Sequence, residues 1–138
     1  MTSSDIDAVL SANLEFYRAF AGRDAAAMDA IWAREAPVTC VHPGWTPLSG
    51  RAGVLKSWRD ILANPESPRV MCHDDQAFLH GEVALVLCEE ELDAGHLIAT
   101  NIFVREAGAW RMVHHQASPI IVRSLEADAR TRRRGPRR

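Results

Sequence analysis

The sequence lacks the features that would place it in a membrane or in a secreted class. No apolar run approaches the roughly 18 residues needed to cross a bilayer, and the stretch from Met1 to Asp7 has neither the basic start nor the apolar segment of a signal peptide. The three cysteines, Cys40, Cys72 and Cys88, are an odd number at wide spacings with no CxxC pair. We therefore expect a cytoplasmic protein whose cysteines act as small buried apolar residues, with redox or metal roles as the alternatives.

The sequence also lacks the motifs that indicate a cofactor or a metal. It has no glycine-rich phosphate loop and no Gly-x-Ser-x-Gly elbow. Six histidines are present, but they form no HExxH or HxH pattern. Neighbours on a strand, such as His73 and Asp74, point to opposite sides. We expect neither a cofactor nor a metal ion.

Charge is distributed unevenly along the 138 residues, whose length fits one domain and whose hydrophobic content of 47% is enough for a core. Six of the sixteen basic residues are arginines within residues 130–138, and no acidic residue accompanies them. The remaining chain is acidic, which argues against a nucleic-acid-binding body. We expect a domain over residues 1–123 and a tail over 124–138 that is helix-prone and then disordered. We expect this tail to bind no specific nucleic acid and no membrane, with RNA and anionic lipid as the alternatives.

Hydrophobic periodicity divides the chain into helices followed by strands. Apolar residues recur at helical spacing over residues 4–22, 24–33 and 51–63. Residues 38–42 form a short β-like run, and residues 45–50 are a loop or a short strand. After Pro68 the period becomes two and predicts four strands: Val70–His80, Glu82–Leu92, His96–Arg105 and Trp110–Ser118. This order indicates an α+β fold with three N-terminal helices packed on one face of the sheet.

The last hairpin relates side chains across the predicted sheet. With its turn at residues 107–108, two pairs face each other and share one side: Phe103 with Met112, and Asn101 with His114. His115 then lies on the other side, and a register error of one residue would exchange His114 and His115. Both sides are partly apolar, so we expect one to meet the helices and the outer one to form a homodimer.

The strand Glu82–Leu92 has an apolar first half and an acidic second half. Alternation places Ala84, Val86, Cys88 and Glu90 on one face. We expect the apolar half to be buried on both sides and the acidic half to reach solvent or the rim of a pocket.

Four motifs then carry a resemblance to a known family. They are Phe16-Tyr17-x-Ala-Phe-x-x-Arg-Asp24; Met28-x-x-Ile-Trp32; Val41-His-Pro-Gly-Trp45, followed by Leu48-x-Gly-Arg51 and Ser57-Trp58; and Gly108-x-Trp-Arg-Met-Val-His-His-Gln-x-Ser118. Over about residues 5–120 the chain resembles the SnoaL-like branch of the nuclear transport factor 2-like superfamily. The resemblance implies a cone, in which helices close one side of a strongly curved mixed or antiparallel sheet around an internal pocket. It does not imply one activity, because the superfamily contains isomerases, cyclases, dehydratases and non-catalytic association domains.

Similarity to ketosteroid isomerase, a member of this superfamily, implies positions for the site. His42, before Pro43, holds the place of that enzyme's acidic base, and Asn101 matches its second pocket acid. Tyr17, the single tyrosine, is the nearest candidate for the enzyme's tyrosine. Because both acids are replaced, steroid isomerisation is not implied. The match places the face of Asn101, Phe103, Met112 and His114 inside the cone.

The residues of that face have chemistry available. A histidine with a pKa near 6.5 can act as a base, so His42 is the candidate proton acceptor, and a strand-capping histidine is the alternative. Asn101 can hold a carbonyl or enolate oxygen, with a buried structural amide as the alternative. His114 is the candidate neighbour of Asn101. The candidate ligand-binding residues are Tyr17, Trp45, Trp58, Phe103 and Met112, with core packing as the alternative for the tryptophans other than Trp45.

Two functions follow from this pattern. The first is a cofactor-independent isomerase, cyclase or dehydratase that acts on a small apolar carbonyl compound with His42 as base. The second is a non-catalytic domain that binds a ligand or dimerises. The segment His114-His115-Gln-Ala-Ser118 is similar to the association domain of calcium/calmodulin-dependent kinases, which favours this second function.

Overall fold

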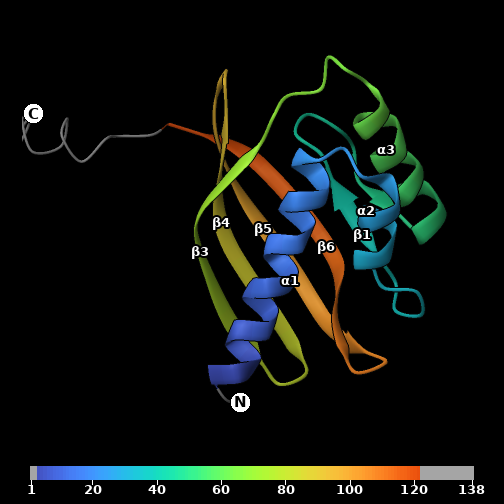
Figure 1. Ribbon diagram of the computed structural model, residues 1–138, viewed down its shortest axis with the longest axis vertical. Helices are drawn as coiled ribbons and strands as arrows, with labels where there is room; N and C mark the ends of the chain where they lie inside the picture. The colour runs from blue at the N-terminus through green and yellow to red at the C-terminus, as the bar shows by residue number, and fades with distance from the viewer. Residues whose placement is uncertain (1–2, 122–138) are drawn as a thin grey trace, which may run out of the picture.

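The computed structural model describes residues 3–121 and contains three helices on one face of a six-stranded sheet (Figure 1). The predicted α+β class is confirmed. The elements in chain order are α1 (Ser3–Ala21), α2 (Ala25–Ile31), β1 (Thr39–Val41), β2 (Leu48–Ser49), α3 (Arg51–Ala63), β3 (Met71–His80), β4 (Val83–Leu92), β5 (Gly95–Glu106) and β6 (Ala109–Ile120). The predicted tail over 124–138 lies outside the described residues.

The sheet is mixed and has the order β2-β1-β6-β5-β4-β3. β1 pairs with β6 in parallel, and the other neighbours are antiparallel. Figure 1 shows α1 crossing the inner face of the long strands, with α3 beside β1. The segment from α3 to β3 arches over one end of the sheet, so that end is enclosed by loop and helix rather than by strands.

Local sequence explains where the helices begin and end. Asp24 caps α2, because its side chain accepts a hydrogen bond from the Ala27 backbone N–H at 3.0 Å. α3 starts after Gly50, which has a φ of 90° that favours glycine. It stops at Ala63, before the Asn64-Pro65 pair, because the residue preceding a proline disfavours helical geometry.

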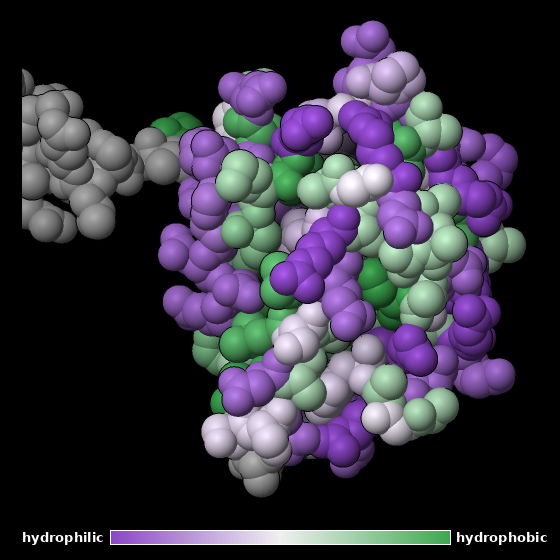
Figure 2. All heavy atoms as spheres, in the orientation of Figure 1, coloured by the Kyte–Doolittle hydropathy of each residue, from purple (hydrophilic) through white to green (hydrophobic). Residues whose placement is uncertain are grey.

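The core fills the space between the helices and the inner face of the sheet. Its largest side chains include Trp32, Trp58, Phe16 and Phe103, all of which are essentially inaccessible to solvent. The free cysteines agree with the sequence expectation, since Cys40 and Cys88 are buried and Cys72 is half-buried. Figure 2 shows that hydrophilic side chains interrupt the apolar ones across the helix-bearing face. Within the described chain, no helix is long and apolar enough to cross a membrane.

The hairpin of β5 and β6 corrects one predicted pairing. Phe103 lies opposite Met112 as predicted, but Asn101 lies opposite His115, not His114. The register shifts because Ile102 pairs with His114 while Phe103 pairs with Met112, which leaves Val113 as an extra residue in β6. Such a β-bulge reverses the faces of the residues that follow it. His115 therefore points inward, and His114 points outward.

Candidate functional site

A pocket of about 500 Å³ opens beneath α3 and the segment that leads to β3. Three polar side chains from separate elements meet in it: His42 after β1, Glu90 of β4 and His115 of β6. Most of the remaining wall is apolar or aromatic. The wall residues with apolar or aromatic side chains are Phe20, Pro43, Trp45, Trp58, Ile61, Pro68, Val70, Leu92 and Leu97. The pocket thus combines an apolar wall with a few converging polar groups, as ligand sites do.

His42 is held between two tryptophans. Its ring centroid lies 4.8 Å from that of Trp45 and 4.9 Å from that of Trp58, both in edge-on geometry. Its Nε2 lies 2.9 Å from the hydroxyl oxygen of Ser57, and that hydroxyl donates its proton to the Val54 carbonyl at 2.6 Å. Nε2 must therefore carry the ring proton and donate to Ser57.

This tautomer leaves Nδ1 of His42 unprotonated. Burial raises the pKa of the Cys40 thiol to about 12, so the thiol stays protonated and donates a long, weak hydrogen bond to Nδ1 across 4.0 Å. Burial also lowers the pKa of His42 to about 4. At neutral pH the residue is a neutral imidazole with Nδ1 available as a base.

His115 is fixed by an amide network behind the pocket floor. Asn101 donates from Nδ2 to Oδ1 of Asn13 at 2.8 Å and to the Tyr17 hydroxyl at 3.1 Å. Its own Oδ1 lies 2.6 Å from Nδ1 of His115, so this nitrogen donates to it. Nε2 of His115 is then the unprotonated nitrogen. Burial, with smaller repulsion from His42, lowers the pKa of His115 to about 3.

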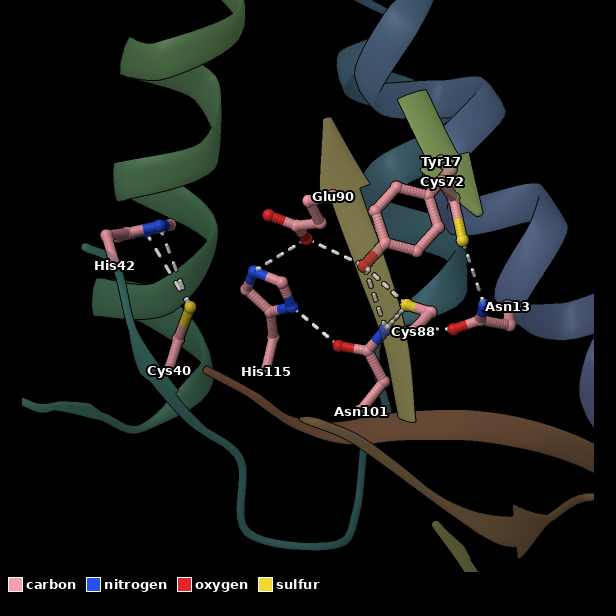
Figure 3. A network of polar contacts seen from close by, with 9 residues as sticks. All are labelled: Asn13, Tyr17, Cys40, His42, Cys72, Cys88, Glu90, Asn101 and His115. Atoms are coloured by element: carbon pink, nitrogen blue, oxygen red, sulfur yellow. Dashed lines mark hydrogen bonds and ion pairs between the residues drawn. The ribbon is translucent and has the colours of Figure 1, made fainter. Parts of the chain in front are cut away.

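Glu90 is a buried carboxyl between these groups (Figure 3). The Tyr17 hydroxyl donates to its Oε2 at 2.7 Å. Burial raises the pKa of Glu90, and the Tyr17 hydrogen bond opposes this in part. Oε2 lies 3.8 Å from Nε2 of His115. This contact is not an ion pair, because the His115 imidazole is neutral. Oε1 accepts no hydrogen bond from any residue in the described chain.

The predicted site residues separate into three groups, two of which lie at the pocket. His42, Trp45 and Trp58 line it. Asn101 and Tyr17 lie behind its floor, where their polar atoms are committed to neighbours. They position the pocket groups rather than touch its space.

Three predicted residues lie away from the pocket. His114 is on the outer side of the sheet, where its Nδ1 contacts the Thr39 hydroxyl at 2.7 Å, because the bulge turns it outward. Phe103 and Met112 face inward but are fully buried and do not line the cavity. The backbone of Trp32 pairs with that of Met112 beside β6.

Two important residues were missed. Glu90 shares a face with Ala84, Val86 and Cys88, and that alternation was the available signal. The acidic half of β4 was expected to reach solvent or the rim of a pocket; Glu90 lines the pocket, but at 2% exposed it lies inside the pocket and not in solvent. Ser57 was part of the Ser57-Trp58 motif of the resemblance but had no predicted role, because its role depends on where α3 packs. Between residues 3 and 121, no group of three His, Cys, Asp or Glu side chains is arranged to hold a metal ion.

Comparison with known proteins gives matches over most of the chain. The family model of the SnoaL-like domain matches residues 9–122. The "putative dehydratase from the NTF2-like family" of Streptomyces avermitilis is 34% identical, with 87% of this chain and 99% of that chain covered and a TM-score of 0.78. The "putative calcium/calmodulin-dependent protein kinase type II association domain" of Thiobacillus denitrificans is also 34% identical, with 80% and 93% covered and a TM-score of 0.71.

A curated relative is longer than this chain. F-box protein SKIP8 of Arabidopsis thaliana is 28% identical over 117 residues, which cover 83% of this chain and 51% of that protein. The chain thus spans about half the length of the curated relative that it matches.

Proposed function

The chain belongs to the SnoaL-like domain family, and we propose that its pocket catalyses a cofactor-independent proton transfer on a small, largely apolar carbonyl compound. The reaction is of the isomerase, cyclase or dehydratase type. The observation that carries the proposal is the convergence of a neutral imidazole with an unprotonated nitrogen, His42, and a buried carboxyl, Glu90, on one apolar pocket. The 34% identity to the protein named a "putative dehydratase" supports it.

His42 acts as the base in this proposal. Its Nδ1 takes a proton from the carbon beside the carbonyl group, and the electron pair of that C–H bond moves toward the carbonyl oxygen. Ser57 accepts a hydrogen bond from the opposite ring nitrogen throughout, so the ring keeps its orientation. His42 is buried and, with a pKa of about 4, is in its neutral, proton-accepting form at working pH.

Glu90 stabilises the oxygen that becomes negative. Its raised pKa favours the protonated carboxyl, which donates a hydrogen bond from Oε1 to the enolate oxygen. Asn101 was the sequence candidate for this role, but its amide is occupied by Asn13, Tyr17 and His115. Return of the proton from His42 to a different carbon completes an isomerisation. Loss of a hydroxyl group, protonated on departure, completes a dehydration.

Hydrogen–deuterium exchange tests this proposal without knowledge of the natural substrate. Cyclohexanone and 2-cyclohexenone are incubated with the protein in D₂O, and loss of the proton signal beside the carbonyl is followed by NMR. We expect exchange above the buffer rate, a loss of at least about 100-fold in His42→Ala, and a smaller loss in Glu90→Gln. His80→Ala, which changes an exposed histidine, serves as the matched control. Equal exchange by His42→Ala and the wild type would overturn the proposal.

A second proposal concerns the outer face of the sheet, which we propose binds a second copy of this chain. Phe78, Val83, Leu87 and Ile98 are large apolar residues there, each between 38% and 44% exposed. Four long strands of about ten residues present roughly 600 Å² of flat area, which is close to the ~800 Å² per partner of a stable interface. The 34% identity to a protein named an association domain also supports self-assembly.

Sedimentation equilibrium tests the homodimer. We expect the wild type to sediment as a dimer at micromolar concentration and Leu87→Glu to sediment as a monomer, because a carboxylate is then buried without a partner. Leu14→Glu is the matched control, since Leu14 is 47% exposed on α1. A monomeric wild type, or dissociation by both variants, would contradict the proposal.

We also propose a cytoplasmic location, which the three free thiols support. Cell fractionation of the tagged full chain checks it. Recovery outside the cytoplasmic fraction would contradict it.

A further inference from the structure

The hydrogen bonds behind the pocket floor fix what the pocket offers to a ligand. His42 donates its single ring proton to Ser57, and His115 donates its own to Asn101. Each histidine therefore has one unprotonated nitrogen: Nδ1 of His42, which has only the long contact with the Cys40 thiol, and Nε2 of His115. Glu90 adds one oxygen, Oε1, that accepts no hydrogen bond from residues 3–121.

These groups make an unbalanced set. Two imidazole nitrogens are acceptors, whereas Glu90, whose pKa is raised by burial, is the donor beside them when its carboxyl is protonated. The buried Nε1–H of Trp58, which has no hydrogen-bond partner in the described chain, is a further donor on the wall. Of His42, His115 and Glu90, a simple ketone satisfies two. Its oxygen accepts a hydrogen bond from the protonated Glu90, and the C–H bond beside its carbonyl group faces His42. Nothing in such a ligand donates to Nε2 of His115.

Leaving that nitrogen unpaired is costly. His115 is 2% exposed, and closure of a ligand over the pocket removes its remaining contact with water. A buried polar atom without a partner is unfavourable. Glu90 cannot compensate, because a distance of 3.8 Å from Oε2 to Nε2 is too long for a hydrogen bond.

We propose that the ligand of this pocket carries a hydroxyl or N–H group next to its carbonyl, and that Nε2 of His115 accepts a hydrogen bond from it. The inference rests on the proposed proton-transfer function for the carbonyl part of the ligand. It adds that hydroxy or amino ketones and aldehydes are the preferred substrates, with simple ketones bound more weakly. No lysine or arginine lines the pocket within the described chain, so a carboxylate or phosphate on the ligand finds no cationic partner.

His115 is then a specificity-determining residue. Sites that hydrogen-bond a substrate O–H or N–H discriminate strongly against analogues without it, because the site's own polar group is left unpaired. The Asn101 contact is what makes this possible, since it prevents His115 from presenting an N–H to the pocket.

Three matched ketones test the inference on the wild-type protein. These are 2-hydroxycyclohexanone, 2-methoxycyclohexanone and 2-methylcyclohexanone, and binding is followed by the fluorescence of Trp45 and Trp58, which line the pocket. We expect the hydroxy ketone to bind at least about tenfold more tightly than either analogue. Equal binding of the methoxy and hydroxy ketones, or failure of all three to bind, would overturn the inference.

Nitrogen NMR of protein labelled with ¹⁵N-histidine gives a second readout. In the free protein, Nε2 of His115 should show the shift of an unprotonated imidazole nitrogen. The hydroxy ketone should move this resonance in the direction of hydrogen-bond acceptance, and the methoxy ketone should not. A protonated Nε2 in the free protein would contradict the inference directly.

A variant separates this inference from the proposed catalysis. His115→Phe should lose the preference for the hydroxy ketone but still bind 2-methylcyclohexanone, whereas His114→Phe, on the outer face, should keep the preference. If His115→Phe does not fold, the wild-type ketone series and the NMR shifts still decide. Selective binding of the hydroxy ketone without deuterium exchange would support the inferred ligand class and contradict the proposed catalysis. Deuterium exchange without selective binding would support the catalysis and contradict the inferred ligand class.

Discussion

The inner face of the sheet has two ends that differ in how they are covered. At the closed end, Phe103 and Met112 are fully buried, and the backbone of Trp32 pairs with Met112. At the open end, Glu90, Leu97 and His115 line a pocket. Both ends belong to the same strands, β4 to β6, so strand pairing does not account for the difference.

The covering elements account for it. Beside the closed end, the chain after α2 binds directly to β6, because the Ala33 backbone N–H donates to the Met112 carbonyl at 2.9 Å. Over the open end, the cover is α3 and the loop of residues 64–70, and Trp58 reaches His42 and His115 edge-on or tilted instead of filling the space. Stability is thus concentrated at one end, and polar chemistry at the other.

The largest expected effect comes from cutting a side chain at the closed end. Phe103→Ala should lower the free energy of unfolding by about 3–5 kcal/mol, because it leaves a cavity in packed surroundings. Leu97→Ala, at the open end, should cost clearly less, because Leu97 already borders space. Urea denaturation measures both variants. Equal losses of unfolding free energy in the two variants would contradict the view that the closed end is packed more tightly than the open end.

Acid should destabilise the protein because two buried histidines at the open end, His42 and His115, are neutral in the folded state. The folded-state pKa values of His42 and His115, about 4 and about 3, lie below the unfolded value near 6.5. The unfolded chain therefore takes up protons first as pH falls, and stability should drop below pH ~6.5 by up to about 1.4 kcal/mol per pH unit for each histidine.

Glu90 acts with the opposite sign, because its raised folded-state pKa makes protonation favour the folded state. Measuring the pH dependence of unfolding in Glu90→Gln therefore isolates the histidine contribution. A profile that is flat between pH 6.5 and 4.5 in that variant would show that the histidines are not buried in neutral form.

Ser57→Ala should have an intermediate effect. It leaves the Nε2 proton of His42 without its acceptor, at a cost of about 1–3 kcal/mol in stability. Because the ring tautomer is then no longer fixed, deuterium exchange of cyclohexanone should fall while the protein remains folded. Thermal denaturation and the exchange assay measure the two effects. Unchanged exchange would argue against a role of this hydrogen bond in orienting the base.

Trp45→Ala should have the smallest effect on stability, about 1 kcal/mol or less, because Trp45 is 48% exposed. Its effect should appear instead in binding, with 2-hydroxycyclohexanone held roughly three- to tenfold more weakly as one aromatic contact is lost. Fluorescence of the remaining pocket tryptophan, Trp58, measures this. A large loss of stability with unchanged binding would assign Trp45 to the core.

Periodicity predicted the helices and the four long strands to within a few residues, because each segment buries one face. It also paired Phe103 with Met112 correctly. It could not assign His114 and His115, because the bulge at Val113 lies between flanking residues that fit either face. Only packing against the helices selects one of the two registers.

The pocket chemistry was harder to predict than the fold. Both pocket acids of ketosteroid isomerase are replaced in this chain, by His42 and Asn101, which suggested a cavity without a carboxyl group. Glu90 nevertheless supplies a carboxyl group from a different strand, β4. Tyr17 and Asn101 were identified as polar partners, but their roles depend on which atoms donate, and this is decided by contacts between β5, β6 and α1. Sequence spacing carries no information on hydrogen-bond direction across elements.

The bulge at Val113 has a consequence for how such pockets change over evolutionary time. Deleting that one codon would restore the regular alternation of β6 and leave His115 inward and His114 outward, because only the extra residue between Met112 and His114 is removed. A lineage can therefore gain or lose one residue here without changing which histidine faces the ligand. Any alignment of relatives that forbids a gap at this position will equate residues from opposite faces of the sheet.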